Sequence, residues 1–421
     1  MQNKVFLPDD VWLNIFDWAA FVPNAFDTHA PDLFSYPGPC SQEQIQGGIR
    51  DTLCTKRRIV LVCRTWNSLA TPFLYKAIPI VRKTTLEKIL RTLSMTDENG
   101  VDTETWKGRW TIRLDIILKY GGQLPADDFI ALLRLLPDLR VIVARSDFFA
   151  FTQSNGPISL IDLLGVARQS ALLGSLHVLD IRSVRGADRI DALDAIDGLS
   201  LRIVRIYPPV LSLWLGKRIT LPEIELLDAP PQLLKSVFSG EIPAGTLRHL
   251  SIKDDFDAVW KIVGGHLSRV GGQLMSLEID DGCLDNSVII RHISRPTPKA
   301  FFREVAHSCP NLDSLIINSK LRSLSYLGDG LLPVRRLGLR FHQKDADGKN
   351  WLKHLCSVLS ICVSISDSLR VIRIVGRPSY AELQDHHSGS LKIMQNFSKA
   401  VLLGSRVRFE DWTGRLFHDV A

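Results

Sequence analysis

Leu247-Arg248-His249-Leu250-Ser251-Ile252 carries aliphatic residues at the first, fourth and sixth positions of a six-residue stretch. On a β-strand, the fourth and sixth residues share one face, and the third and fifth residues share the other. The stretch therefore predicts a strand with one buried and one polar face. Further copies are Leu139/Ile142/Ala144, Leu176/Leu179/Ile181, Leu201/Val204/Ile206, Leu221/Ile224/Leu226, Leu274/Leu277/Ile279, Leu312/Leu315/Ile317, Val334/Leu337/Leu339 and Leu369/Ile372/Ile374, with weaker copies at Leu114/Ile116 and Val407/Phe409.

The copies follow one another at intervals of 20 to 38 residues. Amphipathic helical spacing fills several of the intervals, at 126–136, 159–173, 256–270, 299–308 and 350–366. A strand-then-helix unit repeated in this way is typical of a solenoid, in which each unit buries its apolar side against its neighbours. We therefore predict an α/β fold whose residues 110–421 form an irregular leucine-rich-repeat solenoid. A doubly wound α/β sheet is the alternative, but the glycine-rich phosphate turn of its nucleotide-binding members is missing.

Two helical segments precede the repeats. Residues 7–20 have apolar side chains at helical spacing behind Pro8, and residues 57–75 show a second apolar stripe that ends near Pro72. Residues 21–54 between them contain several prolines and glycines and predict a loop or a partly ordered insert. We divide the chain into a helical module (1–80), a linker helix and loop (81–109), and the solenoid (110–421).

The helical module resembles an F-box. The resemblance rests on Leu7-Pro8-x-Asp10-Val11 with Ile15-Phe16, and on Val60-Leu61-Val62-Cys63-Arg64-x-Trp66 followed by Pro72-x-Leu74-Tyr75. It covers about a fifth of the chain. The long insert departs from the shorter link of a typical F-box, although fungal F-box proteins often carry such an insert. The resemblance leaves the position of the middle helix open.

An F-box joined to leucine-rich repeats is similar to the substrate receptors of Skp–cullin–F-box ubiquitin ligases. The resemblance implies that the module docks on a Skp-type adaptor, and through it on a cullin, while the repeats hold a protein target. The residues that match the motif and would contact the adaptor are Leu7, Pro8, Val11, Ile15, Phe16, Leu61, Val62, Trp66, Leu74 and Tyr75. A pair of helices that only caps the solenoid is the alternative.

The predicted polar face of the solenoid carries charges that change sign along the chain. Basic residues are expected early and late in the repeats, and acidic residues in the middle, which suits a target with a complementary pattern. The candidate target-binding residues are Arg182, Arg205, Glu223, Glu225, Glu278, Asp280, Arg336, Arg340 and Arg373. An ordinary solvated sheet face is the alternative interpretation.

Nothing in the sequence predicts catalysis. Nucleotide-binding, nucleophile-elbow and zinc-protease motifs are missing, and we expect no enzyme activity, metal or cofactor. A net charge of +6 on 421 residues does not indicate nucleic acid binding, and no apolar run predicts a membrane span. Seven dispersed cysteines favour a reducing compartment, and we expect an intracellular protein of the cytoplasm or nucleus. A scaffold that ubiquitylates nothing and an enzyme with an unrecognised site remain alternative functions.

Overall fold

The computed structural model describes residues 7–32, 34, 42–94, 107–118, 123–146, 150–153, 156–158, 164–165, 174–183, 196–206, 218–229, 234, 237–238, 246–253, 266–280, 298–318, 334–340, 357, 359–360, 363, 367–375, 399, 406–411, 414 and 416. The chain divides into two compact units. Unit 1 comprises residues 1–29, 40–213 and 219–222, and unit 2 comprises residues 30–39, 214–218 and 223–421. Part of the predicted insert, residues 30–39, therefore belongs with the later repeats. The predicted boundaries at 80 and 110 do not separate these units.

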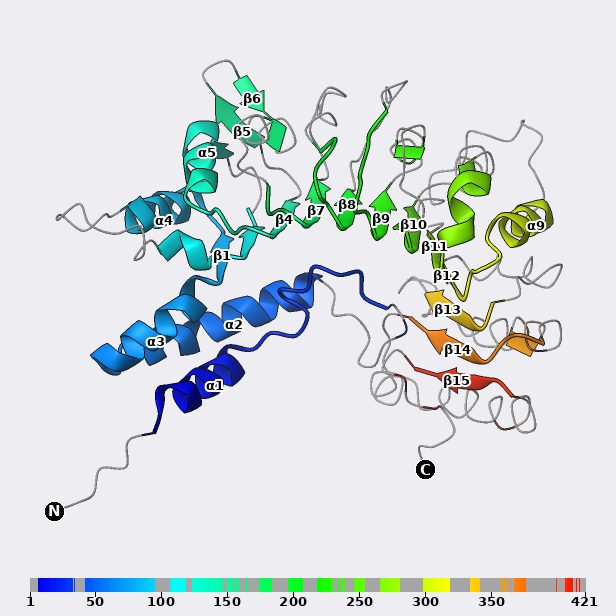
Figure 1. Ribbon diagram of the computed structural model, residues 1–421, viewed down its shortest axis with the longest axis horizontal. Helices are drawn as coiled ribbons and strands as arrows, with labels where there is room; N and C mark the ends of the chain where they lie inside the picture. Colours follow the sequence, from blue (N-terminus) through cyan, green and yellow to red (C-terminus); the bar gives the residue numbers. More distant parts are fainter. Residues whose placement is uncertain are drawn as a thin grey trace. The chain divides into compact units, whose positions relative to one another are not determined.

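Unit 1 begins with helices and continues into parallel strands (Figure 1). Its elements are α1 (Asp9–Ala20), α2 (Gln42–Val60), α3 (Arg64–Tyr75), β1 (Ala77–Ile80), α4 (Lys83–Ser94), a 3-10 turn η2 (Lys107–Trp110), β2 (Arg113–Ile116), β3 (Gln123–Pro125), α5 (Ala126–Arg134), β4 (Val141–Ser146), β5 (Ala150–Gln153), β6 (Gly156–Ile158), β7 (Val178–Ser183) and β8 (Ile203–Ile206). Strands β3, β5 and β6 form a separate small sheet.

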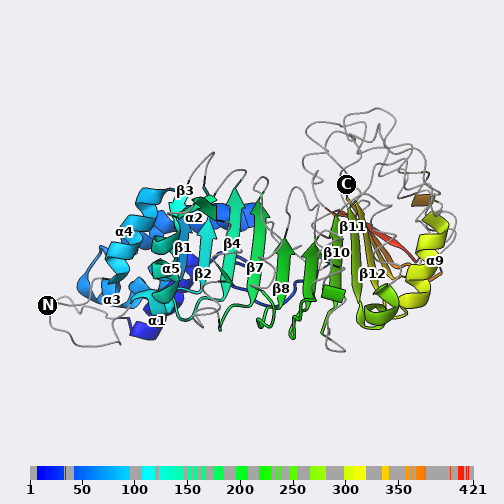
Figure 2. The same ribbon diagram turned by 90° about the horizontal axis from the view of Figure 1, so that it is seen from above.

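The main sheet of unit 1 has the parallel order β1-β2-β4-β7-β8, which Figure 2 shows from above. The fourth position of the repeat stays aligned along the row Ile78, Leu114, Ile142, Leu179 and Val204. This row is buried throughout. Helices α4 and α5 lie on one side of the strands in Figure 1 and α2 on the other. The apolar row is thus the core that holds successive strands in register.

Unit 2 repeats the same arrangement. Its elements are β9 (Leu226–Ala229), β10 (His249–Lys253), η4 (Gly271–Gln273), β11 (Ser276–Asp280), α9 (Pro298–Ser308), β12 (Ser314–Asn318), β13 (Arg336–Arg340), β14 (Val371–Ile374) and β15 (Arg408–Glu410). The strands are all parallel and pair in chain order. Leu227, Leu250, Leu277, Leu315 and Leu337 align and are buried.

The predicted α/β repeat fold is confirmed. Five strands in the sheet of unit 1 and seven in unit 2 follow the chain order without reversal, which is a solenoid-like arrangement consistent with leucine-rich repeats. A doubly wound sheet reverses its strand order at a switch point. The described strands show no such reversal within either unit, so the alternative fold is wrong.

The structure differs from the sequence predictions at three places near the N-terminal module. The repeats begin at Ala77 in β1, well before residue 110, because Ile78 and Ile80 already provide the two buried positions. Residues 42–54 of the predicted insert are helical and belong to α2, whereas residues 61–63 break the segment predicted as one helix over 57–75. Pro72 lies inside α3 and does not end it.

Two of the predicted solenoid helices correspond to α5 and α9, and residues 266–270 are helical as expected. Most of the predicted helices at 159–173 and 350–366 lies outside the described residues. The described helices include none that is long and apolar enough to cross a membrane.

Candidate functional site

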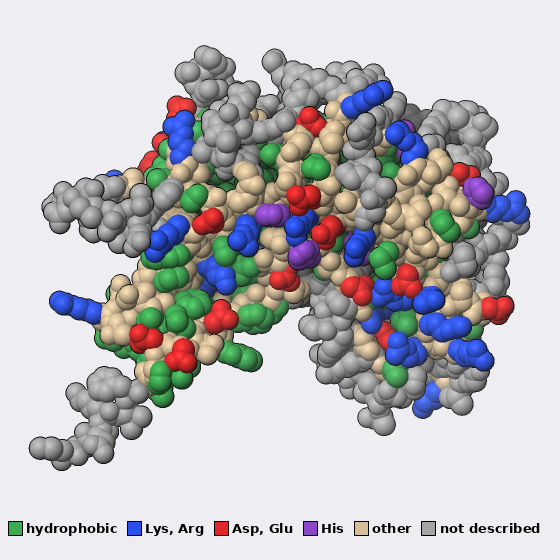
Figure 3. Space-filling model, in the orientation of Figure 1, with side chains coloured by type: hydrophobic (Ala, Val, Ile, Leu, Met, Phe, Trp, Pro, Cys, Tyr) green, Lys and Arg blue, Asp and Glu red, His purple; other side chains and the backbone are tan. Residues whose placement is uncertain are grey.

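Helix α1 carries apolar side chains on two different sides. Trp12, Phe16 and Ala20 repeat every four residues and turn inward, with Phe16 only 1% exposed. Ile15 and Trp18 lie on another side, and Trp18 is 83% exposed. The inward stripe packs against the rest of the module, whereas the large apolar side chains of the outward stripe are exposed to solvent. Figure 3 shows hydrophobic side chains gathered on the surface of α1 and α3.

An aromatic cluster fixes α1 on α3. The ring centroids of Trp12 and Trp66 are 4.5 Å apart, and Phe16 meets Trp66 edge-on at 5.1 Å. Val60 and Ala70 complete the buried centre. Such aromatic contacts contribute about 0.5–1.5 kcal/mol beyond their buried area. The module therefore has a small core of its own.

The turn between α2 and α3 exposes two adjacent apolar residues. Leu61 is 80% exposed and Val62 is 59% exposed. The Cys63 thiol caps α3 by accepting from the Trp66 N–H at 3.5 Å, and the Asn67 amide donates to the Val60 carbonyl at 2.9 Å. These two hydrogen bonds hold both ends of the turn, so Leu61 and Val62 are presented outward on a fixed backbone.

The predicted adaptor-contacting residues divide into two groups. The exposed group consists of Leu7, Pro8, Ile15, Leu61 and Val62, with Val11 half-buried. Trp66, Leu74 and Tyr75 are half-buried, and the first two pack on the module's core. Phe16 differs from both groups, because its ring fills the interior of the module and offers no surface to an adaptor.

Sequence reasoning missed one prominent exposed residue. Trp18 is far more exposed than Trp12 and Trp66, and it follows Val11 by seven positions and Ile15 by three, on the outward side of α1. That spacing is the signal that could have identified it. We call Leu7, Val11, Ile15, Trp18, Leu61 and Val62 the apolar patch.

A buried ion pair holds the segment after α1 and the start of α2 against the sheet of unit 1. The Arg113 guanidinium donates to both oxygens of Asp115 at 2.8 Å, to the Ala25 carbonyl at 2.9 Å and to the Gln42 amide oxygen at 2.8 Å. Gln46 donates to Asp115 at 3.1 Å. Arg113 and Asp115 are each about 1% exposed, and sequence reasoning assigned neither a role.

The polar face of unit 2 is neutralised by pairs within the chain. Arg336 pairs with Asp313 and Asp32, Arg340 Nη1 lies 2.5 Å from Glu278 Oε1, and Arg373 donates to Glu410. In unit 1, Arg205 Nη1 is 3.9 Å from Asp180 Oδ2. The side chains of Arg182 and Asp280 lie outside the described part of the chain. The arginines Arg336, Arg340 and Arg373 of this face are thus each paired with an acidic residue of the same unit.

The repeat at β9 was predicted in the wrong frame. Leu227 pairs with Leu250 and Ala229 with Ile252, so the copy is Ile224/Leu227/Ala229. The residues are aliphatic in both frames, and parallel pairing selects the later one. Glu223 and Glu225 consequently precede the strand and do not lie on it, whereas buried Asp228 occupies the face position.

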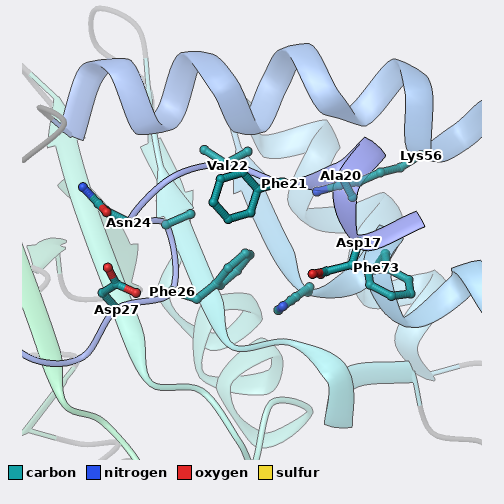
Figure 4. Close-up of a pocket in the computed structure, with 11 residues that line it drawn as sticks. Asp17, Ala20, Phe21, Val22, Asn24, Phe26, Asp27, Lys56 and Phe73 are labelled. Carbon is teal, nitrogen blue, oxygen red and sulfur yellow. The ribbon is translucent and has the colours of Figure 1, made fainter. Parts of the chain in front are cut away.

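A small cavity of about 140 Å³ lies in unit 1 beside the end of α1 (Figure 4). It is lined by Asp17, Ala20, Phe21, Val22, Asn24, Ala25, Phe26, Asp27, Lys56, Phe73 and Lys76. Typical small-molecule sites measure about 300–1,000 Å³. The cavity is too small to support a catalytic assignment by itself.

Lys56 in this cavity provides a pH-dependent prediction. Its burial, together with nearby Lys76, lowers the pKa of the Lys56 amine from 10.5 to about 8. An unfolded chain thus binds the proton more tightly, and below pH 8 the native state is penalised by about 3 kcal/mol. The penalty shrinks as pH rises from about 8 to 10.5, so stability contributed through this group increases over that range.

We expect Lys56→Met to raise the free energy of unfolding by about 2–3 kcal/mol at pH 7, with the gain vanishing near pH 10.5. Urea unfolding of both proteins across pH 7–10.5 measures the difference. Lys88→Met on the exposed side of α4 is the matched control. A gain that is independent of pH would contradict the titration.

Other chemistry finds little support among the described residues. No group of three histidine, cysteine or acidic side chains in the described ranges is placed to hold a metal ion. Cys309 is buried, and burial raises the pKa of its thiol to about 12, which disfavours a nucleophilic thiolate. No protein-family model matches the chain, and no curated protein matches it either.

Proposed function

We propose that this protein is the substrate receptor of a Skp–cullin–F-box ubiquitin ligase. The helical module docks on a Skp-type adaptor through the apolar patch, and the repeats hold a protein target. The observation that carries the proposal is the exposure of adjacent Leu61 and Val62 on a capped turn, inside the stretch that resembles an F-box. Contiguous apolar exposure of this kind is a feature of protein–protein interaction sites.

The energetics favour a partner over a mere capping role. Covering a Leu or Val side chain contributes about 1.5–3 kcal/mol, and the patch contains several such side chains. Trp12, Phe16 and Trp66 already form the contacts that pack the module internally. Leu61, Val62 and Trp18 are therefore not needed for that packing, and their exposure is explained by a partner.

The mechanism of such a receptor is proximity. Tethering a target to a ligase raises its local concentration beside a separate conjugating enzyme, and the receptor supplies no catalytic group. The parallel strands of unit 2, with their paired arginines, offer a rigid surface for that target. A scaffold that binds the adaptor without ubiquitylation is the second candidate.

Reconstitution separates the two candidates. Partners captured on the tagged chain are identified by mass spectrometry and added to the purified chain with the adaptor, cullin, conjugating enzyme and ubiquitin. We expect chain-dependent ubiquitylation of at least one captured partner. Capture of the adaptor without modification of any partner would support the scaffold, and failure to capture the adaptor would reject both.

A further inference from the structure

A short stretch of the insert lies on the polar face of unit 2. The Ala30 N–H donates to Glu225 Oε2 at 3.1 Å, and Asp32 accepts from Arg336 Nη1 at 3.0 and 3.2 Å. The Phe34 carbonyl accepts from Arg373 Nη1 at 2.7 Å. We call residues 30–32 and 34 the cis segment. It contains no helix or strand, so contacts with unit 2 determine its position.

The Phe34 ring occupies a closely fitted cradle. The guanidinium carbons of Arg336 and Arg373 lie 5.0 and 5.4 Å from the ring centroid, and Phe34 is 6% exposed. Gly338 forms the floor, where an added Cβ would come 3.3 Å from Phe34 Cζ and 2.8 Å from Ile316. Two cations against one aromatic ring give an attraction that is specific for aromatic side chains.

The cradle is built by the strands and not by its occupant. Asp313 accepts from Arg336 Nε at 2.6 Å, and Glu410 accepts from Arg373 Nε at 3.0 Å. Each arginine is therefore oriented by an acidic residue of unit 2 and has donors left for a ligand. A site whose donors are already positioned loses little conformational entropy when a ligand binds. The contacts that orient Arg336 and Arg373 thus come from unit 2 outside the cis segment.

Asp32 and Phe34 use different parts of this site. Burial alone would raise the pKa of the Asp32 carboxyl, but the Phe34 N–H and Arg336 outweigh it and lower the pKa. Asp32 is thus held as a carboxylate beside a cation, two residues before an aromatic ring between two cations. The complementary ligand is a peptide with an acidic residue two positions before an aromatic residue, in the turned conformation that the Phe34 N–H to Asp32 Oδ1 hydrogen bond gives the cis segment.

We propose that Arg336, Gly338 and Arg373 form a docking site for an acidic-x-aromatic peptide of a partner protein, which the cis segment occupies until that partner displaces it. In a ligase receptor, which is the proposed function, this partner is the target. A tethered segment competes at a millimolar effective concentration. The intact chain consequently binds such a peptide weakly, and weakening the cis segment increases the affinity.

The test uses the labelled peptide Thr28–Phe34 added in trans and fluorescence anisotropy. We expect full-length Asp32→Lys to bind the peptide at least tenfold more tightly than the unaltered chain. Asp32 is half exposed, so this substitution leaves the core intact. Asp32→Ala with Phe34→Ala is the second variant, and it is used after its thermal unfolding confirms a folded protein.

Controls assign the binding to the cradle. Peptides with Asp→Lys or Phe→Ala should bind at least tenfold more weakly to Asp32→Lys. Adding Arg373→Met should weaken binding at least tenfold, because it removes one of the two cations beside the ring and the donor to the Phe34 carbonyl; the variant is used after its thermal unfolding confirms a folded protein. Equal binding of a scrambled peptide, or no binding to either weakened variant, would overturn the proposal. Adaptor capture is measured separately on the unaltered chain, and its failure would reject the proposed ligase function without affecting the peptide result.

Discussion

Leu61→Asp combined with Val62→Asp is expected to reduce affinity for a Skp-type adaptor by at least about 100-fold. Each aspartate replaces an apolar side chain that would be desolvated at the interface, and losing two such contacts amounts to about 3–5 kcal/mol. Both residues are exposed, and the side-chain hydrogen bonds of the turn come from Cys63 and Asn67. The variant should therefore fold normally. Isothermal titration with purified adaptor measures the change.

Thr84→Asp with Lys88→Asp provides the control for added negative charge. Both side chains are exposed on α4, outside the apolar patch. We expect this control to bind within about twofold of the unaltered chain. Equal adaptor affinity of the Leu61/Val62 variant and the unaltered chain would show that this turn is not the docking surface.

Arg113→Met is expected to lower the free energy of unfolding by about 3–5 kcal/mol. Removing one partner of a buried ion pair leaves an uncompensated charge, here Asp115, and also removes the hydrogen bonds to Ala25 and Gln42. The loss should loosen the contact of α2 with the strands of unit 1. Urea unfolding followed by tryptophan fluorescence measures it, since α1 and α3 carry three tryptophans.

Adding Asp115→Leu to Arg113→Met tests whether the unpaired Asp115 carboxylate causes the loss of stability. Without the orphaned carboxylate, we expect about half of the lost stability to return. Arg134→Met, exposed on α5, should change stability by no more than about 0.5 kcal/mol. If Arg113→Met were as stable as the Arg134 control, the buried pair would not hold the helices on the sheet.

The repeat fold was predictable because a period of two within a strand is a local property. Leu250 and Ile252, for example, identify their own strand and its buried face. The frame at β9 was not predictable, because residues 221–229 are aliphatic in two frames and only pairing with β10 distinguishes them. Strand β1 was not predicted, because it is short and only its pairing with β2 identifies Ile78 and Ile80 as the buried positions of a repeat.

The charged site was less accessible to sequence reasoning. Arg336 and Arg373 were singled out as candidate target-binding residues, but their contacts Asp32 and Phe34 precede them by more than 300 residues. Such contacts have no periodic signal. In the helical module, the motif included both Leu61, which is exposed, and Phe16, which is buried, because a match to a motif does not distinguish packing from docking. For the same reason Trp66→Ala would confound core loss with binding loss.

The most direct test of the receptor assignment is calorimetric titration of the purified full-length chain with a cognate Skp-type adaptor. We expect one-to-one binding with a dissociation constant below about 1 µM, equivalent to roughly 8 kcal/mol. We also expect this binding to disappear when Leu61→Asp and Val62→Asp are combined. Absence of any detectable binding between the unaltered chain and the adaptor at 50-fold higher concentration, about 50 µM, would contradict the receptor assignment.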